Sequence, residues 1–178
     1  YVSANPTGPM HVGHGRGAVV GDVLANLLGK AGYSVTKEYY INDAGTQIDI
    51  LTKSLFFRYQ EALGLDVGNM PEDYYPGDYL AELARNLAEK DGDKWIQIIK
   101  EEGYASLKQV SIEAMMELIR SDLFSLGIVH DVFVSERDIV NNSEVTEALE
   151  TLKQKGLIYQ GVLEPPKGRR PDDWEPRP

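Results

Sequence analysis

The sequence predicts an α/β protein in which a parallel sheet is combined with a mainly helical insertion. A β-prone start, a proline- and glycine-rich turn, an apolar helical repeat and a second β-prone stretch follow one another over residues 1–41. A strand, a helix and a strand in this order favour a right-handed crossover and parallel pairing. From residue 64 to residue 126 the sequence becomes turn-rich and then mostly helical in its periodicity.

The chain begins with a short predicted strand and a turn. Tyr1–Ala4 is half apolar and β-prone, which predicts a strand. Asn5–Pro9 cannot form regular structure, because Pro6 and Pro9 lack a backbone N–H. In a parallel sheet, ligands bind at the carboxyl ends of strands, where this turn would lie.

A helix and a second strand come next. The helix starts near Val12 and is predicted to end at Gly32, because glycine commonly terminates helices. Its apolar face is predicted to consist of Val12, Val19, Val20, Val23, Leu24, Leu27, Leu28 and Ala31. Residues 35–41 are β-branched and aromatic, which predicts a strand, and Asn42-Asp43 would cap a helix running to about residue 63.

Two helices are predicted in the insertion, at residues 79–91 and 95–126, the second interrupted near Gly103. An apolar stripe on the second one is expected to pack in the core: Leu107, Val110, Ala114, Met115, Leu118, Ile119 and Leu123.

After the insertion, a short strand is predicted at residues 132–134 and a helix at residues 144–155. A further strand is predicted at residues 157–163. The last fifteen residues hold five of the nine prolines and predict an exposed loop.

Composition narrows the functional class. The 178 residues carry a formal net charge of −10, which argues against an extended nucleic-acid surface. The acidic excess lies outside residues 1–60, which hold five basic and four acidic side chains, so an anionic ligand is compatible with the turn. There is no cysteine, no long apolar run and no signal-peptide pattern, and we expect a cytoplasmic protein without a membrane span.

The turn has the chemistry of a phosphate site. A helix that begins near Val12 presents unpaired N–H groups and partial positive charge. His11 and His14 are three residues apart, so they can share one face of the first turn and donate to phosphate oxygens. Gly13 has no side chain, so a flat base can approach the backbone there.

Two other interpretations of the histidines stay open at this point. The pair could hold a metal, but His130, the third histidine, lies in a different predicted element and cysteine is missing, so no protein-bound metal is expected. Alternatively, His11 and His14 could simply cap a helix beside a structural turn.

The sequence resembles the class I aminoacyl-tRNA synthetases, whose HIGH signature is matched by "HVGH" at residues 11–14. The longer string "VSANPTGPMHVGHGRGAVVGDVLANLL" looks specifically like arginyl-tRNA synthetase. So do "YYINDAGTQI", "PEDYYPGDYL", "FSLGIVHDVFVSE" and "KGLIYQGVLEPPKGRRPDDWEPR", in the same order along the chain.

The resemblance implies a Rossmann-like, HUP-type nucleotide-binding core, of which this chain would hold the first half. Residues 1–63 would be the first half of the core, residues 64–130 the helical insertion, and residues 131–178 the return to a core strand and a proline-rich loop. The implied reaction is attack of the arginine carboxylate on the α-phosphate of ATP, then transfer of arginine to tRNA(Arg). ATP would enter with Mg²⁺.

The resemblance also implies roles for individual residues. His11 and His14 would be catalytic and, with Gly13, would bind ATP, while Asn5 and Ser3 would hold arginine. The HIGH region would comprise Ala4, Asn5, Pro6, Thr7, Gly8, Pro9, Met10, His11, Val12, Gly13 and His14.

Residues outside the HIGH region are weaker candidates. Asp43 and Gln47 could border the site, although a helix cap is an equally good interpretation of Asp43. Tyr74, Tyr75 and Tyr79 could lie near the acceptor end of tRNA, but packing is the favoured interpretation. His130 is expected to be structural. Lys167, Arg169 and Arg170 could meet RNA phosphates, or simply form a solvated loop.

The family's lysine-rich KMSK-like loop has no counterpart here, since no Lys-Met pair occurs. We therefore expect a catalytic-domain fragment with little or no activity when isolated. Two rival functions are a small HxGH nucleotidylyltransferase acting on a phosphate ester and a non-catalytic nucleotide- or RNA-binding module.

Overall fold

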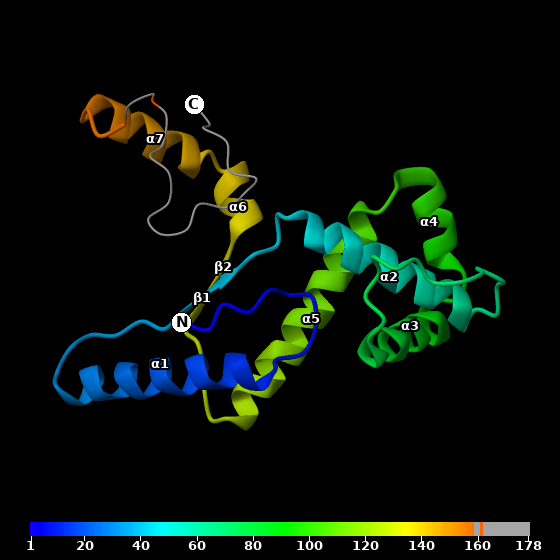
Figure 1. The fold of residues 1–178 in the computed structure, drawn as a ribbon, viewed down its shortest axis with the longest axis horizontal. Helices are drawn as coiled ribbons and strands as arrows, with labels where there is room; N and C mark the ends of the chain where they lie inside the picture. Colours follow the sequence, from blue (N-terminus) through cyan, green and yellow to red (C-terminus); the bar gives the residue numbers. More distant parts are fainter. Residues whose placement is uncertain (159–160, 162–178) are drawn as a thin grey trace, which may run out of the picture. The chain divides into compact units, whose positions relative to one another are not determined.

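The computed structural model describes residues 1–158 and residue 161 (Figure 1). The chain divides into two compact units, Tyr1–Asp138 and Ile139–Pro178, which are described separately. Within the described residues, no helix combines the length and the apolar character needed to cross a membrane.

The first unit contains a two-stranded parallel sheet. Strand β1 (Glu38–Ile41) pairs with β2 (Val132–Ser135), and Glu38 stands opposite Val132 in the register. The predicted strand at residues 132–134 is confirmed, and the one at residues 35–41 is confirmed only in its second half. The two strands are separated along the chain by the helical insertion, as a parallel pair requires of its connection.

The predicted strand at Tyr1–Ala4 is wrong. Val2 has φ of 64°, which interrupts an extended backbone. The segment still lies along β1, but it is attached by side chains: the Tyr40 N–H donates to Ser3 Oγ at 3.1 Å, and the Tyr39 hydroxyl donates to the Ala4 carbonyl at 2.7 Å.

Helix α1 (Val12–Lys30) is confirmed, and Gly32 follows its end with φ of 91°. Its apolar face, however, does not pack against the described residues. Val12 is 92% exposed, and the side chains from Val19 to Leu28 on that face are about half exposed. The helix instead faces the core with its small residues: Ala18 is fully buried, and a Cβ at Gly21 would overlap the ring of Tyr1.

Four helices lie between β1 and β2; the first leads from β1 to the insertion, and the other three form the insertion. They are α2 (Thr46–Ala62), α3 (Asp78–Asp91), α4 (Lys94–Glu102) and α5 (Ala105–Ser125). The predicted interruption is confirmed at Gly103, whose φ of 76° separates α4 from α5. The expected cap of α2 is wrong, because Gly45 is its N-cap and no side chain caps this end.

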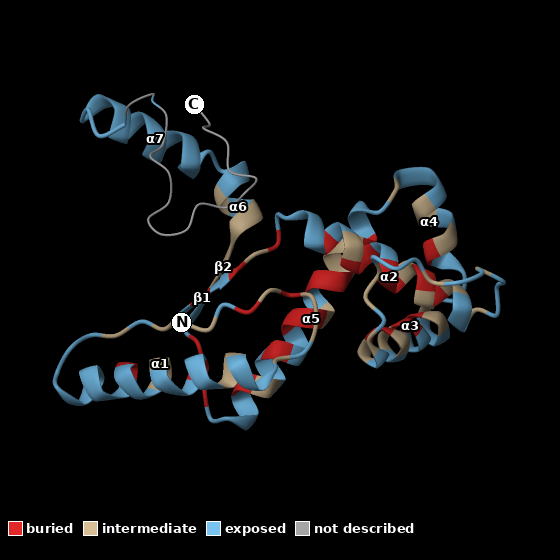
Figure 2. Ribbon diagram, in the orientation of Figure 1, coloured by how far each residue is buried: buried red, intermediate tan, exposed pale blue. Residues whose placement is uncertain are grey.

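The core of this unit consists of two clusters. One joins β1 to α1, α2 and α5, and the other joins α2 to α3, α4 and α5. Buried positions therefore follow α2 and α5 along most of their length (Figure 2). The predicted core stripe of α5 is largely confirmed, since Leu107, Met115, Ile119 and Leu123 are buried, whereas Leu118 is 37% exposed.

Helix α6 (Glu136–Asn141) contains the boundary between the two units, and α7 (Glu144–Gln154) lies in the second. The predicted helix at residues 144–155 is thereby confirmed. The strand predicted at residues 157–163 and the proline-rich loop lie largely outside the described residues.

Candidate functional site

A pocket of about 540 Å³ opens beside the turn that precedes α1. It is lined by Ser3, Ala4, Asn5, Thr7, Gly8, Pro9, His11, His14, Gln47, Tyr75 and Tyr79. Five residues predicted for the site from the sequence, Ser3, Asn5, His11, His14 and Gln47, are thus brought to one cavity. Gly13 and Asp43 are not among the lining residues.

The two histidines form a reciprocal cap on α1. His11 is the N-cap residue, and its Nδ1 accepts from the Gly13 N–H at 3.1 Å. His14 Nδ1 lies 3.4 Å from the His11 backbone N, the geometry of a capping box. The imidazole rings stack with centroids 3.7 Å apart and an angle of 18° between their planes.

This cap sets which nitrogen of each ring faces a ligand. Because each Nδ1 accepts a backbone hydrogen bond, the proton of the neutral ring belongs on Nε2. Burial, together with the neighbouring His11, lowers the pKa of His14. The pair therefore offers Nε2–H donors at a helix end whose first turn carries no acidic side chain.

Gly13 has a role in this geometry that the sequence did not reveal. A Cβ at this position would lie 3.0 Å from Cε1 and 3.1 Å from Nδ1 of His11. That spacing is tighter than ordinary packing, so a side chain here would require the His11 ring to shift by a few tenths of an ångström from its position in the cap.

Three amide side chains form a hydrogen-bonded chain beside the turn. Asn5 Nδ2 donates to Gln47 Oε1 at 2.9 Å, and Asn42 Nδ2 donates to Asn5 Oδ1 at 3.3 Å. The end of β1 and the start of α2 thus fix the Asn5 amide. Sequence analysis missed Asn42, although its place at the end of a predicted strand was a usable signal.

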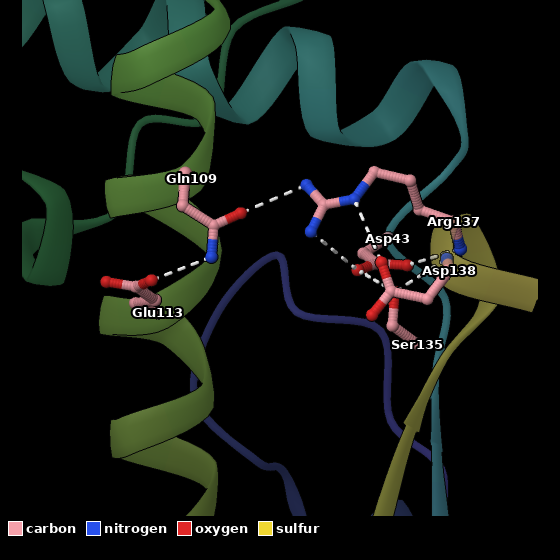
Figure 3. Close-up of polar contacts among 6 residues, drawn as sticks. All are labelled: Asp43, Gln109, Glu113, Ser135, Arg137 and Asp138. Carbon is pink, nitrogen blue, oxygen red and sulfur yellow. Dashed lines mark hydrogen bonds and ion pairs between the residues drawn. The ribbon is translucent and has the colours of Figure 1, made fainter. Parts of the chain in front are cut away.

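Asp43 lies just behind this amide chain, with 2% of its surface exposed. Its carboxylate accepts from Ser135 Oγ at 2.7 Å and from the Arg137 N–H at 3.0 Å, so it binds the end of β2 and the start of α6 (Figure 3). The Arg137 guanidinium lies 3.9 Å from the carboxylate and donates to Gln109 of α5 at 3.0 Å (Figure 3). Asp43 therefore ties both strand ends to the insertion, and its place at the border of the site stays a prediction.

Tyr75 and Tyr79 line the pocket, although packing was the favoured interpretation for both. Both also lie against the cluster of α2, α3, α4 and α5, so they serve the core as well. The Tyr79 hydroxyl donates to the Thr7 carbonyl at 2.7 Å. Their exposure to the pocket depends on a contact between segments 72 residues apart, which no local sequence pattern indicates.

His130 lies in the loop before β2 and is 7% exposed. Its ring contacts those of Tyr1 and Tyr39, with centroids at 4.8 and 5.3 Å. Burial lowers its pKa, and neither ring nitrogen has a hydrogen-bond partner among the described residues. Lys167, Arg169 and Arg170 lie outside the described residues.

Comparison with known proteins gives a consistent result. Residues 1–162 match the family described as tRNA synthetases class I (R), catalytic domain. The arginine–tRNA ligase of Parvibaculum lavamentivorans is 56% identical over 178 residues, which is 100% of this chain and 30% of that protein. The arginine–tRNA ligase of Agrobacterium fabrum is also 56% identical, over 99% of this chain and 31% of that protein.

Two solved structures share the fold. One from Campylobacter jejuni, provisionally named an arginyl-tRNA synthetase, superposes with a TM-score of 0.76 at 40% identity and covers 92% of this chain and 34% of its own. The arginyl-tRNA synthetase of Thermus thermophilus superposes with a TM-score of 0.56 at 25% identity, over 96% of this chain and 28% of its own. The chain spans less than a third of its curated relatives, and within that third it belongs to the catalytic-domain family of the class I arginyl-tRNA synthetases.

Proposed function

We propose that the protein containing this chain is an arginine–tRNA ligase, which activates arginine with ATP and transfers it to tRNA(Arg). The carboxylate of arginine attacks the α-phosphorus, and the bond from that phosphorus to the bridging oxygen of pyrophosphate breaks. Arginyl-adenylate and pyrophosphate result, and the adenylate then passes arginine to the terminal adenosine of the tRNA.

The observation that carries this proposal is the stacked histidine pair in the pocket. As the carboxylate attacks, negative charge increases on the oxygens around phosphorus. Donors that are already fixed in place stabilise that charge without reorganising. The Nε2–H groups of His11 and His14 are such donors, because the cap holds both rings through Nδ1.

Asn5 and Ser3 are assigned to the amino-acid part of the pocket. The Asn5 amide is held on both sides, by Asn42 and Gln47, so its orientation is restricted before arginine binds. Ser3 Oγ accepts from the Tyr40 N–H, which leaves the hydroxyl proton available for a carboxylate.

The proposal includes Mg²⁺, a cytoplasmic location and the three-part division at residues 63 and 130. Among the described residues there is no group of three or more acidic or histidine side chains that could hold a metal ion. Mg²⁺ is therefore assigned to the phosphates of ATP, which it commonly binds together with few protein ligands. The division is supported by α3, α4 and α5, which form between the two paired strands.

The test is ATP–pyrophosphate exchange by the complete polypeptide that contains this chain, in the presence of tRNA. We expect exchange to depend on arginine, and lysine or a phosphorylated vitamin precursor not to replace it. Exchange supported by the phosphate ester and not by arginine would favour the nucleotidylyltransferase, which the family match does not favour. Salt-sensitive tRNA binding without any exchange would favour the binding module.

A further inference from the structure

The helical insertion holds the histidine turn at two backbone atoms. From the first turn of α3, the Tyr79 hydroxyl donates to the Thr7 carbonyl at 2.7 Å. From the last turn of α5, Asp122 Oδ2 accepts from the Met10 N–H at 3.0 Å. Thr7 and Met10 flank Gly8 and Pro9, so the two bonds hold the backbone on both sides of this pair.

The Tyr79 ring is fitted closely between two glycines. A Cβ at Gly8 would lie 3.0 Å from the Tyr79 hydroxyl oxygen, and a Cβ at Gly77 would overlap the ring. The ring also packs against the buried cluster of α2, α3, α4 and α5. Burial raises the pKa of Tyr79, so its hydroxyl keeps the proton that it donates.

The same turn determines where the histidines lie. His11 follows Met10 directly and caps α1, and its ring stacks on His14. A shift of the Thr7–Met10 backbone would therefore move the His11 ring and its Nε2 relative to the pocket. Tyr79 also lines that pocket, so the residue that supports the turn is itself part of the pocket wall.

We propose that Tyr79 is a positioning residue, which transmits the placement of the insertion to the histidine pair through the Thr7 carbonyl. Asp122 supports the same turn at Met10. The effect on catalysis rests on the proposed function, whereas the effect on the order of the turn does not. A displacement of α3, such as one caused by a ligand on the insertion, would change the rate of the chemical step.

The test compares Tyr79→Phe with Tyr59→Phe in the complete polypeptide. The Tyr59 hydroxyl likewise donates to a backbone carbonyl, that of Gly92, but this bond joins α2 to the end of α3, and neither residue lines the pocket. Both variants lose one tyrosine–carbonyl hydrogen bond and keep the ring, and Tyr59→Phe also loses the bond that the Trp95 N–H donates to the hydroxyl at 3.4 Å, so the control variant removes at least as much. Amide hydrogen exchange of residues 5–14 and the steady-state constants of pyrophosphate exchange are measured for both.

We expect Tyr79→Phe to speed amide exchange in residues 5–14 about fivefold, the weight of one hydrogen bond, and to lower kcat five- to tenfold with little change in KM for arginine. Tyr59→Phe should change neither. Asp122→Ala should resemble Tyr79→Phe, and Asp122→Asn, which keeps an acceptor oxygen, should be closer to wild type.

Equal behaviour of the two tyrosine variants, in either direction, would overturn the positioning role. If the wild-type polypeptide shows no arginine-dependent exchange, the proposed function fails, but the hydrogen-exchange comparison still decides whether Tyr79 orders the turn. If Tyr79→Phe is misfolded by circular dichroism, the Asp122 pair tests the other bond by which the insertion holds the turn: unchanged amide exchange and kcat in Asp122→Ala would overturn the proposal that the insertion positions the turn.

Discussion

Replacing His14 by asparagine separates the two tasks that the structure gives to this ring. His14 Nδ1 accepts the backbone N–H of His11, while Nε2 is left for the ligand. His14 is the third residue of the helix, not the N-cap, and an asparagine oxygen can take the place of Nδ1 there, since both atoms are bonded to Cγ. The same substitution removes the Nε2–H donor entirely. His14→Gln is the matched variant, because its longer amide can place an N–H near the Nε2 position.

The size of the effect follows from the type of bond that is lost. Removal of one fixed donor to a developing oxyanion lowers kcat about 100- to 1,000-fold. The cap itself contributes about 1 kcal/mol to stability, so loss of the cap alone would leave kcat nearly unchanged. We therefore expect His14→Asn to lower kcat of arginine-dependent exchange at least 100-fold with less than about 1 kcal/mol lost in urea unfolding. His14→Gln should recover part of the rate.

The assay is steady-state pyrophosphate exchange by the complete polypeptide, with urea unfolding of the same preparations. A His14→Asn variant within about threefold of the wild-type kcat would refute the role of Nε2 as a donor. A variant that loses rate and stability together, with no recovery in His14→Gln, would show that the ring acts only through the fold.

Three further predictions concern other parts of the structure. Gly13→Ala places a methyl group 3.0 Å from the His11 ring, so it should lower the free energy of urea unfolding by about 1 kcal/mol and weaken ATP binding measured by calorimetry. Gly17→Ala is the control on the same helix: a Cβ there meets nothing within 4 Å, so this variant should be neutral or stabilising. Asp43→Ala leaves the Ser135 hydroxyl and the Arg137 N–H without their acceptor and should lower the free energy of unfolding by about 2–4 kcal/mol. Asp138→Ala, at the exposed end of the same network, should lower it by less than about 0.5 kcal/mol. Equal losses would contradict the capping role of Asp43. Burial lowers the pKa of His130, so the unfolded state binds this proton more tightly than the folded state does. The contribution of His130 to stability is therefore complete above pH 6.5 and is lost as the pH falls from there toward the lower folded pKa. His130→Phe should flatten the decline of the melting temperature between pH 7.5 and 5.5, and an unchanged slope would disprove this.

The sequence predicted the elements where local signals were strong. The helix interruption at Gly103 and the apolar repeat of α5 depend on a few neighbouring residues; the interruption is confirmed and the repeat is largely confirmed. The segment Tyr1–Ala4 was assigned wrongly because its attachment to β1 comes from the Ser3 side chain and the Tyr39 hydroxyl, not from a backbone ladder. Asp43 looked like a cap for the next helix, but its partners Ser135 and Arg137 lie more than ninety residues away.

The residues of the pocket likewise divide into those that a local sequence pattern indicates and those that tertiary contacts bring to it. Residues in the string Ser3–His14 could be nominated together because they are contiguous, and the spacing of His11 and His14 indicated a shared face. Asn42 and Tyr79 reach the turn from β1 and from the insertion, and their bonds to Asn5 and Thr7 depend on tertiary packing. The orientation of the rings, with Nδ1 in the cap and Nε2 left over, is likewise a property of the folded turn.

The central claim is that His11 and His14 meet ATP through Nε2–H groups, and nitrogen NMR of the histidine side chains measures this directly. The complete polypeptide, labelled with ¹⁵N-histidine, is titrated with Mg-ATP at pH 7.5, and buried His130 serves as the internal reference. We predict that both rings carry a proton on Nε2 before ATP is added, and that both Nε2 signals shift on ATP binding while the signals of His130 stay in place. Protons on Nδ1, or ATP binding that leaves the His11 and His14 signals unmoved, would contradict the account.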